Sequence, residues 1–95
     1  MNWSDAKAYC ASKGGKLPRI GGSNKLSSAP SGTPVDGFGS VGAKWPSGLP
    51  GVAYWTGTED SGVADDSWGI YGYGGYVDVD TGPRQSTSYR VVCVP

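Results

Sequence analysis

The chain contains no histidine, which removes the most common general base and the most common transition-metal ligand. It also lacks a basic excess, since Lys and Arg balance Asp and Glu at eight each. Proteins that bind nucleic acid or anionic membrane surfaces usually carry such an excess. No run is long and apolar enough to span a bilayer. We therefore expect no nucleic-acid partner and no direct membrane insertion.

The composition indicates one small, loop-rich domain over residues 1–95. Ninety-five residues suit a single domain with a thin core. Seventeen glycines and seven prolines approach the range of disordered chains, but eleven aromatic residues argue for a folded protein. The start, Met1-Asn2-Trp3, has no signal-peptide pattern. If the domain is secreted, we expect it to be a fragment of a longer protein.

The two cysteines lie near opposite ends of the chain, and each lies in a segment that is predicted to be regular. A bond between Cys10 and Cys93 would join the first element to the last and would imply an oxidising compartment. Two unrelated buried thiols are the alternative interpretation.

The order of elements predicts an α+β domain. A helix is expected at residues 4–13, with Ser4 as N-cap and with Trp3, Ala6 and Cys10 on one face. Residues 16–20 read as extended, and residues 21–51 as a long loop with a second short helix at 24–28. The loop is expected to be fixed to the core by Phe38, Val41 and Trp45. An antiparallel sheet is expected from strands at 52–58, 68–71, 76–80 and 89–94. The Gly74-Gly75 turn joins the second and third of these strands, and the last is predicted to be central and buried on both sides.

Three segments resemble the motifs of C-type-lectin-like domains. The first is Trp3-x-x-Ala6-x-x-x-Cys10 followed by Gly14-Gly15-x-Leu17-Pro18, which resembles the opening helix. The second, Tyr54-Trp55-Thr56-Gly57-Thr58-Glu59, resembles the mid-domain tryptophan strand in its bacterial form. The third, Tyr89–Val94, resembles the closing strand. Together the motifs span the chain, and they are most similar to the C-terminal tip domains of intimin- and invasin-type bacterial outer-membrane adhesins.

The resemblance implies a C-type-lectin-like fold whose first helix and closing strand are joined by a Cys10–Cys93 disulfide. It also implies display on the bacterial outer-membrane surface, outside the cell, and attachment to a host receptor. The resemblance does not extend to calcium-dependent sugar binding by the usual route. Members that bind sugar in this way carry a Glu-Pro-Asn or Gln-Pro-Asp triplet and a Trp-Asn-Asp triplet, and neither occurs here.

Exposed aromatic residues are the first candidates for ligand binding. Trp3, Trp55 and Trp68 are expected in the core, because a large ring contributes much to a thin core. Trp45, beside Lys44 in the glycine-rich loop, is either a core anchor or a binding residue. Tyr71 and Tyr73, on one strand face, are either a recognition surface or an aromatic ladder that stabilises the hairpin.

Four carboxylates, Glu59, Asp60, Asp65 and Asp66, fall in one predicted loop. Oxygen-rich loops suit Ca²⁺, but the EF-hand spacing is absent, so we interpret them as solvated or receptor-contacting groups and expect neither a metal nor a cofactor. A carboxylate pair could serve glycoside hydrolysis, yet nothing predicts an apolar pocket to raise one pKa. We expect no enzymatic activity.

Three functions remain open on the sequence. The first is a receptor-binding adhesin tip, a monomer that recognises a host-cell surface protein through Lys44, Trp45, Tyr71, Tyr73 and the carboxylate loop. The second is a calcium-independent module that binds a glycan on Trp45 or the tyrosines. The third is a structural cap of an adhesin rod that binds nothing by itself.

Overall fold

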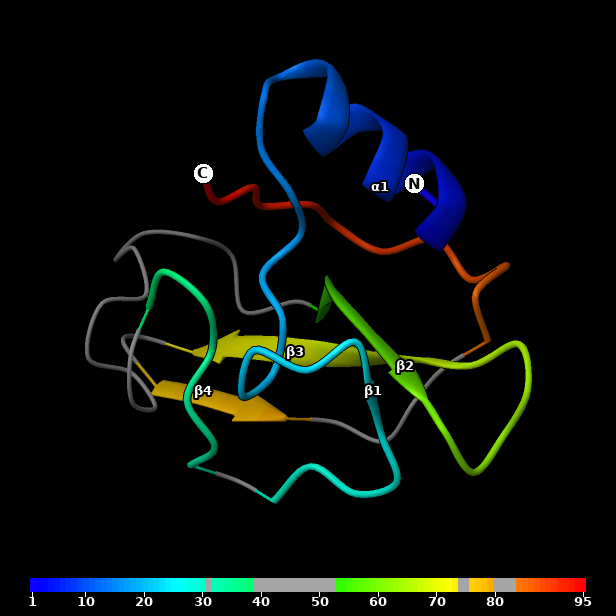
Figure 1. Cartoon of the computed structure of the whole chain (residues 1–95), viewed down its shortest axis with the longest axis vertical. Coiled ribbons are helices and arrows are strands. Elements are labelled where there is room, and N and C mark those ends of the chain that lie inside the picture. The colour runs from blue at the N-terminus through cyan, green and yellow to red at the C-terminus, as the bar shows by residue number, and fades with distance from the viewer. Residues whose placement is uncertain (31, 39–52, 74–75, 80–83) are drawn as a thin grey trace.

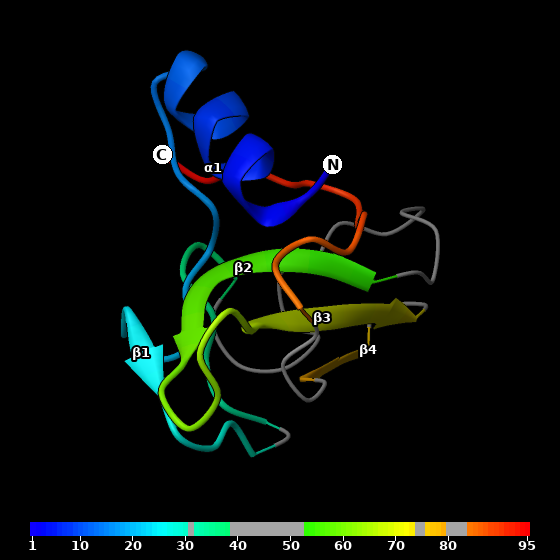
Figure 2. The same cartoon turned by 90° about the vertical axis from the view of Figure 1, so that its right-hand side faces the viewer.

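The computed structural model describes residues 1–30, 32–38, 53–73, 76–79 and 84–95. The single helix of this part, α1 (Trp3–Ser12), lies on one side of a small sheet (Figure 1). The strands are β1 (Lys25–Leu26), β2 (Ala53–Asp60), β3 (Ser67–Tyr73) and β4 (Tyr76–Val79). Both chain ends lie on the helix side of the sheet (Figures 1 and 2). No helix in these ranges is long and apolar enough to span a membrane.

Helix α1 begins before the predicted position because Asn2, not Ser4, is its N-cap. The Asn2 side chain accepts a hydrogen bond of 2.8 Å from the Asp5 amide, which satisfies one of the free N–H groups of the first turn. Trp3, Ala6 and Cys10 are buried on one face, as predicted. The helix ends before Gly14, whose φ of 77° is a left-handed conformation that favours glycine.

The sheet has the strand order β1-β2-β3-β4 and is mixed rather than wholly antiparallel. β2 pairs antiparallel with β3, and β3 with β4, as expected for the meander. β1 was not predicted, because residues 24–28 were expected to form a helical turn. Instead Lys25 and Leu26 run parallel to Glu59 and Asp60, and the Glu59 amide donates to the Asn24 carbonyl at 2.8 Å. The sequence could not predict this parallel pairing, because a strand of two residues is too short to carry a hydrophobic pattern.

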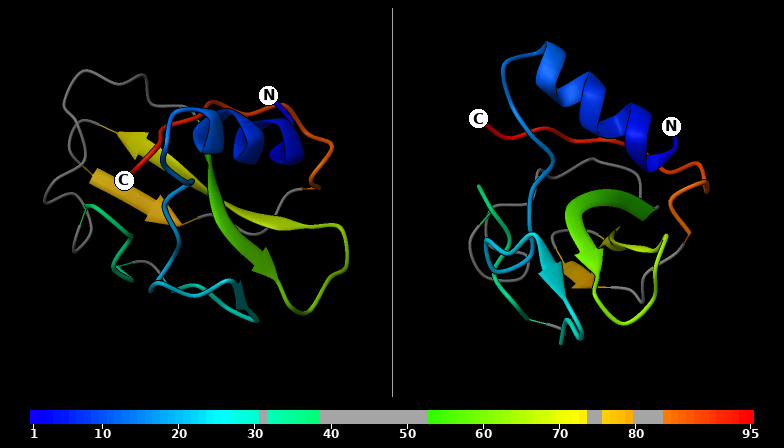
Figure 3. Two further views of the ribbon diagram at one scale, coloured as in Figure 1. Left: turned by 45° about the horizontal axis from the view of Figure 1, so that its top comes forward. Right: turned by 45° about the vertical axis from the view of Figure 1, so that its right-hand side comes forward.

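The prediction of a central closing strand at residues 89–94 is wrong. This segment runs between α1 and the sheet (Figures 2 and 3), and its described hydrogen bonds go to three different partners. The Tyr89 amide donates to Met1, the Arg90 amide to Ala53 of β2, and the Val94 amide to Lys16. Because no single neighbour runs alongside it, no continuous ladder forms. Val91, Val92 and Cys93 are half-buried rather than enclosed on both sides.

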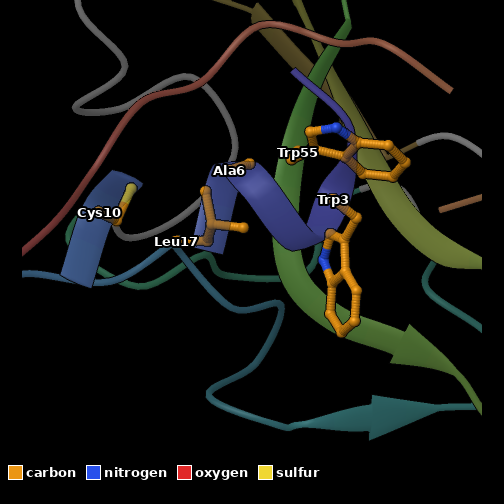
Figure 4. Packing of buried hydrophobic residues seen from close by; sticks show 5 residues of the cluster. All are labelled: Trp3, Ala6, Cys10, Leu17 and Trp55. Atoms are coloured by element: carbon orange, nitrogen blue, oxygen red, sulfur yellow. The ribbon is translucent and has the colours of Figure 1, made fainter. Parts of the chain in front are cut away.

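The core between helix and sheet is built from residues of the three segments that resemble C-type-lectin-like motifs. A cluster of Trp3, Ala6, Cys10, Leu17 and Trp55 is buried there, with Tyr89, Val91 and Cys93 packed against it (Figure 4). Trp68 is buried as well, so all three tryptophans expected in the core are found there. The predicted Cys10–Cys93 disulfide is confirmed and closes this cluster at one end. Sequence-distant motifs therefore meet in one place.

A second cluster lies on the other side of β2. It contains Val35, Tyr54 and Ile70, with Phe38 and Val92 partly buried against it. Phe38 thus fixes this part of the predicted 21–51 loop to the core, as expected. Val41 and Trp45, the other two anchors expected for this loop, lie outside the described residues.

Two buried threonines of β2 fix its neighbours: Thr58 holds the irregular segment around residues 20–23, and Thr56 bonds to strand β3. The Thr58 hydroxyl donates to the Ser23 carbonyl at 2.8 Å and accepts from the Ile20 amide at 2.8 Å. The Thr56 hydroxyl donates to the Trp68 carbonyl at 2.7 Å. Both side chains are fully buried, so these bonds replace water that cannot reach them.

Loss of the disulfide is expected to destabilise the domain strongly. The bond joins residues 83 positions apart, so reduction or a Cys10→Ala/Cys93→Ala variant should cost about 2–5 kcal/mol of unfolding free energy. At about 4–8 °C per kcal/mol, the midpoint of thermal unfolding should fall by at least about 8 °C. Intact mass before and after alkylation checks the bond, and an unchanged melting curve after complete reduction would contradict the prediction.

Thr58→Val should destabilise the fold although the side chain keeps its size. It leaves the Ile20 amide and the Ser23 carbonyl without their buried partner, which should cost about 1–3 kcal/mol. Thr58→Ser is the matched control, because it keeps the hydroxyl and loses only a methyl group. Urea unfolding measures the free energy of unfolding of both variants. A Val variant as stable as the Ser variant would contradict the claim that the hydroxyl stabilises the fold.

Candidate functional site

The four carboxylates that the sequence placed in one loop are divided by the structure into two pairs. Glu59 and Asp60 belong to the end of β2, and the loop between β2 and β3 is shorter than predicted, covering residues 61–66. Glu59 forms an ion pair of 3.6 Å with Lys25 of β1. The Asp60 carboxylate accepts the Gly62 amide at 2.9 Å and closes the turn. These two carboxylates stabilise local structure.

Asp65 and Asp66 instead line an open cavity of about 690 Å³. Its walls are residues 63–66 of the β2–β3 loop and residues 84–86 from the segment near the chain end. Asp66 and Arg84 form an antiparallel bridge, and the Gln85 amide donates to the Asp65 carbonyl at 2.8 Å. The two walls are therefore joined through their backbones.

This cavity between residues 63–66 and 84–86, the loop cavity, is lined by acidic, basic, amide and apolar side chains. Carboxylates, the Arg84 guanidinium and the Gln85 amide line it together with Val63, a half-exposed apolar side chain. Asp65 has a φ of 70°, a left-handed conformation that Asp tolerates better than most residues. Such a surface can bind a polar partner through donors and acceptors. Within the described ranges, no group of three Asp, Glu, His or Cys side chains is arranged to hold a metal ion.

The aromatic candidates are only partly placed. Tyr71 and Tyr73 lie on β3, opposite Asp78 and Tyr76 of β4 in the backbone register. Lys44 and Trp45 lie outside the described residues, and so does the predicted Gly74-Gly75 turn. The structure therefore brings Asp65 and Asp66 together with Arg84 and Gln85, and the Asp60 amide donates to the Asp66 carbonyl at 3.1 Å.

The base of the loop that carries Lys44 and Trp45 is held by Asp36. Its carboxylate accepts the Arg19 Nε at 2.9 Å and the Arg19 amide at 3.2 Å, and lies 3.6 Å from Lys16 Nζ. The Asp36 amide in turn donates to the Arg19 carbonyl at 3.0 Å. This network joins residues 16–20 to residues 34–36, and sequence reasoning missed it because the partners are separated by a loop with no charge pattern.

The environment of Asp36 favours its ionised form. Partial burial by itself raises the pKa of the carboxyl, but the hydrogen bonds from Arg19 and the positive charges of Arg19 and Lys16 outweigh it, so that the pKa is lowered. A depressed pKa in the folded state means that the ionised carboxylate stabilises the fold above its unfolded pKa, near 3.9. This stability is lost as the pH falls through the folded pKa.

Asp36→Asn should therefore destabilise the domain at neutral pH, by about 1–2 kcal/mol. The difference from the parent chain should shrink as the pH falls below about 4, because the parent then loses the same charge. Asp5→Asn, in the first turn of α1 and outside this network, is the control. Urea unfolding at a series of pH values gives the result, and a constant difference down to the most acid pH would contradict the assignment.

No protein-family model, no curated protein and no solved structure matches this chain. The resemblance to C-type-lectin-like domains accordingly rests on the chain's own motifs in residues 3–18, 54–59 and 89–94.

Proposed function

We propose that this chain is the receptor-binding tip domain of an intimin- or invasin-type bacterial adhesin and attaches to a protein on the host-cell surface. One observation carries the proposal. The three segments that resemble the family motifs supply the central cluster around Trp3 and Trp55, and Cys10 and Cys93 form the bond that the resemblance implies. Chance likenesses in separate loops would have no reason to meet in one core.

The disulfide also supports a place outside the cytoplasm, where such bonds form and persist. Both chain ends lie on the helix side of the sheet, while β3 and β4 lie farther from α1 than β2 does (Figure 2). A domain carried by its N-terminal end would thus hold β3, the strand that contains Tyr71 and Tyr73, away from its point of attachment. The loop cavity at Asp65 and Asp66 adds polar groups suited to the rim of a protein interface.

The binding surface is tested by single alanine substitutions at Trp45, Tyr71 and Tyr73. Truncating a true aromatic anchor should cost at least about 2 kcal/mol, or about 30-fold in affinity for epithelial cells. Tyr9→Ala is the matched control, because Tyr9 is an exposed tyrosine on α1. If all three variants bind like the parent chain, the assignment of these residues is wrong.

The nature of the receptor is tested with the same cells after two treatments. Saturable binding that is lost only after the cells are shaved with protease supports a protein receptor. Loss after enzymatic deglycosylation alone favours the calcium-independent glycan-binding module. Absence of saturable binding to any cell leaves the structural cap of an adhesin rod.

A further inference from the structure

The basic residues of this neutral chain are concentrated in its first third. Between Asp5 and Asp36 the sequence has five basic residues and no acidic one: Lys7, Lys13, Lys16, Arg19 and Lys25. Two of them are placed apart from the others. Lys25 is paired with Glu59, and the Lys13 ammonium lies 5.5 Å from the centre of the Tyr9 ring. The other three line one depression.

This depression, the basic groove, has a volume of about 290 Å³. It lies where the chain leaves α1 and runs down past β2 towards β1 (Figure 1). Lys7 and Ala11 of α1 form one wall, and Lys16, Leu17 and Arg19 form another. Gly15, Gly57 and Asn24 complete the lining.

Arg19 is held in a fixed position at this groove. Its Nε donates to the Asp36 carboxylate at 2.9 Å, and one terminal nitrogen donates to the Asn24 side chain at 3.3 Å. Among the described residues its side chain makes no other hydrogen bond, so the remaining N–H groups of the planar guanidinium can bind a ligand. A guanidinium fixed in this way loses little side-chain entropy on binding an oxyanion.

The two lysines add charge without a full counter-charge. The Lys7 ammonium lies 3.7 Å from the centre of the Trp3 ring, a contact that leaves its N–H donors usable. Lys16 shares the single Asp36 carboxylate with Arg19. Three cations line the groove, and Asp36 pairs with two of them, so these groups together carry a surplus of two positive charges. Every charged group that lines the groove is a hydrogen-bond donor.

We propose that the basic groove binds the oxyanion of a carboxylated or sulfated sugar unit. Its volume equals that of about ten water molecules at about 30 Å³ each, which suits one sugar ring rather than an extended oligosaccharide. The lining accepts an anion through Lys7, Lys16 and Arg19, while Asn24 offers an amide to a hydroxyl group. The anion chemistry follows from the groove alone. The choice of a sugar as the carrier of the anion rests on the proposed function, because acidic sugars supply anionic groups at a host-cell surface.

The test is an NMR titration of the ¹⁵N-labelled domain with single sugars. N-acetylneuraminic acid and glucuronic acid supply a carboxylate, glucose 6-sulfate supplies a sulfate, and glucose is the neutral control. We expect saturable shifts of the Gly15, Asn24 and Gly57 amides with an acidic sugar and none with glucose. Whether the carboxylates or the sulfate bind more tightly identifies the source of the anion. Raising the salt to about 1 M should weaken binding, because the groove is open to solvent.

Lysine variants assign the charge to the groove. Lys7→Gln and Lys16→Gln should each weaken binding about two- to five-fold, as expected for partly exposed charges. Lys16→Arg should restore it. Lys13→Gln and Lys25→Gln remove the same charge from the same third of the chain but do not line the groove, and they should bind like the parent.

Several outcomes would overturn the inference. These are saturation by no acidic sugar, equal binding of glucose, or an equal loss from Lys13→Gln and Lys16→Gln, which would indicate attraction to net charge alone. The cell experiment with Trp45, Tyr71 and Tyr73 is independent of this result. A domain that binds cells through those residues but binds no acidic sugar would contradict the groove assignment and leave the adhesin proposal intact. A domain that binds acidic sugars in the groove but does not bind cells through those residues would contradict the adhesin proposal and leave the groove assignment intact.

Discussion

The burial of β2 on both of its faces is the constraint on which the rest of the structure depends. Neighbouring side chains of a strand point to opposite faces, so Trp55 enters the cluster under α1 while Tyr54 enters the cluster with Val35 and Ile70. A domain of this size buries only a limited area of apolar surface. Because β2 is buried on both faces, this one strand contributes side chains to both clusters. The helix, the closing segment and the start of the long loop are placed by their contacts with this strand.

Much of the chain packs against β2 without being regular, and its polar backbone groups need partners. Side chains from the core supply many of them. The indole N–H groups of Trp3, Trp55 and Trp68 donate to the carbonyls of Thr56, Met1 and Leu26, at 2.8, 2.9 and 3.2 Å. The hydroxyls of Thr56 and Thr58 do the same for other carbonyls. The Trp3 indole thus joins α1 to β2, and the Trp55 and Trp68 indoles hold Met1 and β1, so each of these three rings fills the core and also fixes a backbone segment.

The electrostatics of the domain are local although its net charge is zero. Asp36 holds two cations and the base of the long loop together, and the same contact fixes Arg19 beside the basic groove. The Glu59 and Asp60 carboxylates lie at the end of β2, and those of Asp65 and Asp66 line the loop cavity beside Arg84. A chain that composition describes as neutral thus carries a basic groove and, apart from it, a cavity of mixed charge, and each can meet a different kind of partner.

Local signals in the sequence determined the helix and the three main strands, while the bond between Cys10 and Cys93 was implied by the resemblance and is confirmed by the structure. The spacing of Trp3, Ala6 and Cys10 is enough to predict a buried helix face, and the β-forming run through Tyr54 and Trp55 is enough to predict a strand. Only the tertiary structure decided that β1 runs parallel to β2, and that residues 89–94 share their hydrogen bonds among three neighbours. It likewise gave the Glu59 and Asp60 carboxylates their local partners, Lys25 and the Gly62 amide, and brought Lys7, Lys16 and Arg19 to one groove. The reason is physical: periodicity and turn residues act over a few positions, whereas the pairing of distant backbones and charges depends on which segments the core brings side by side.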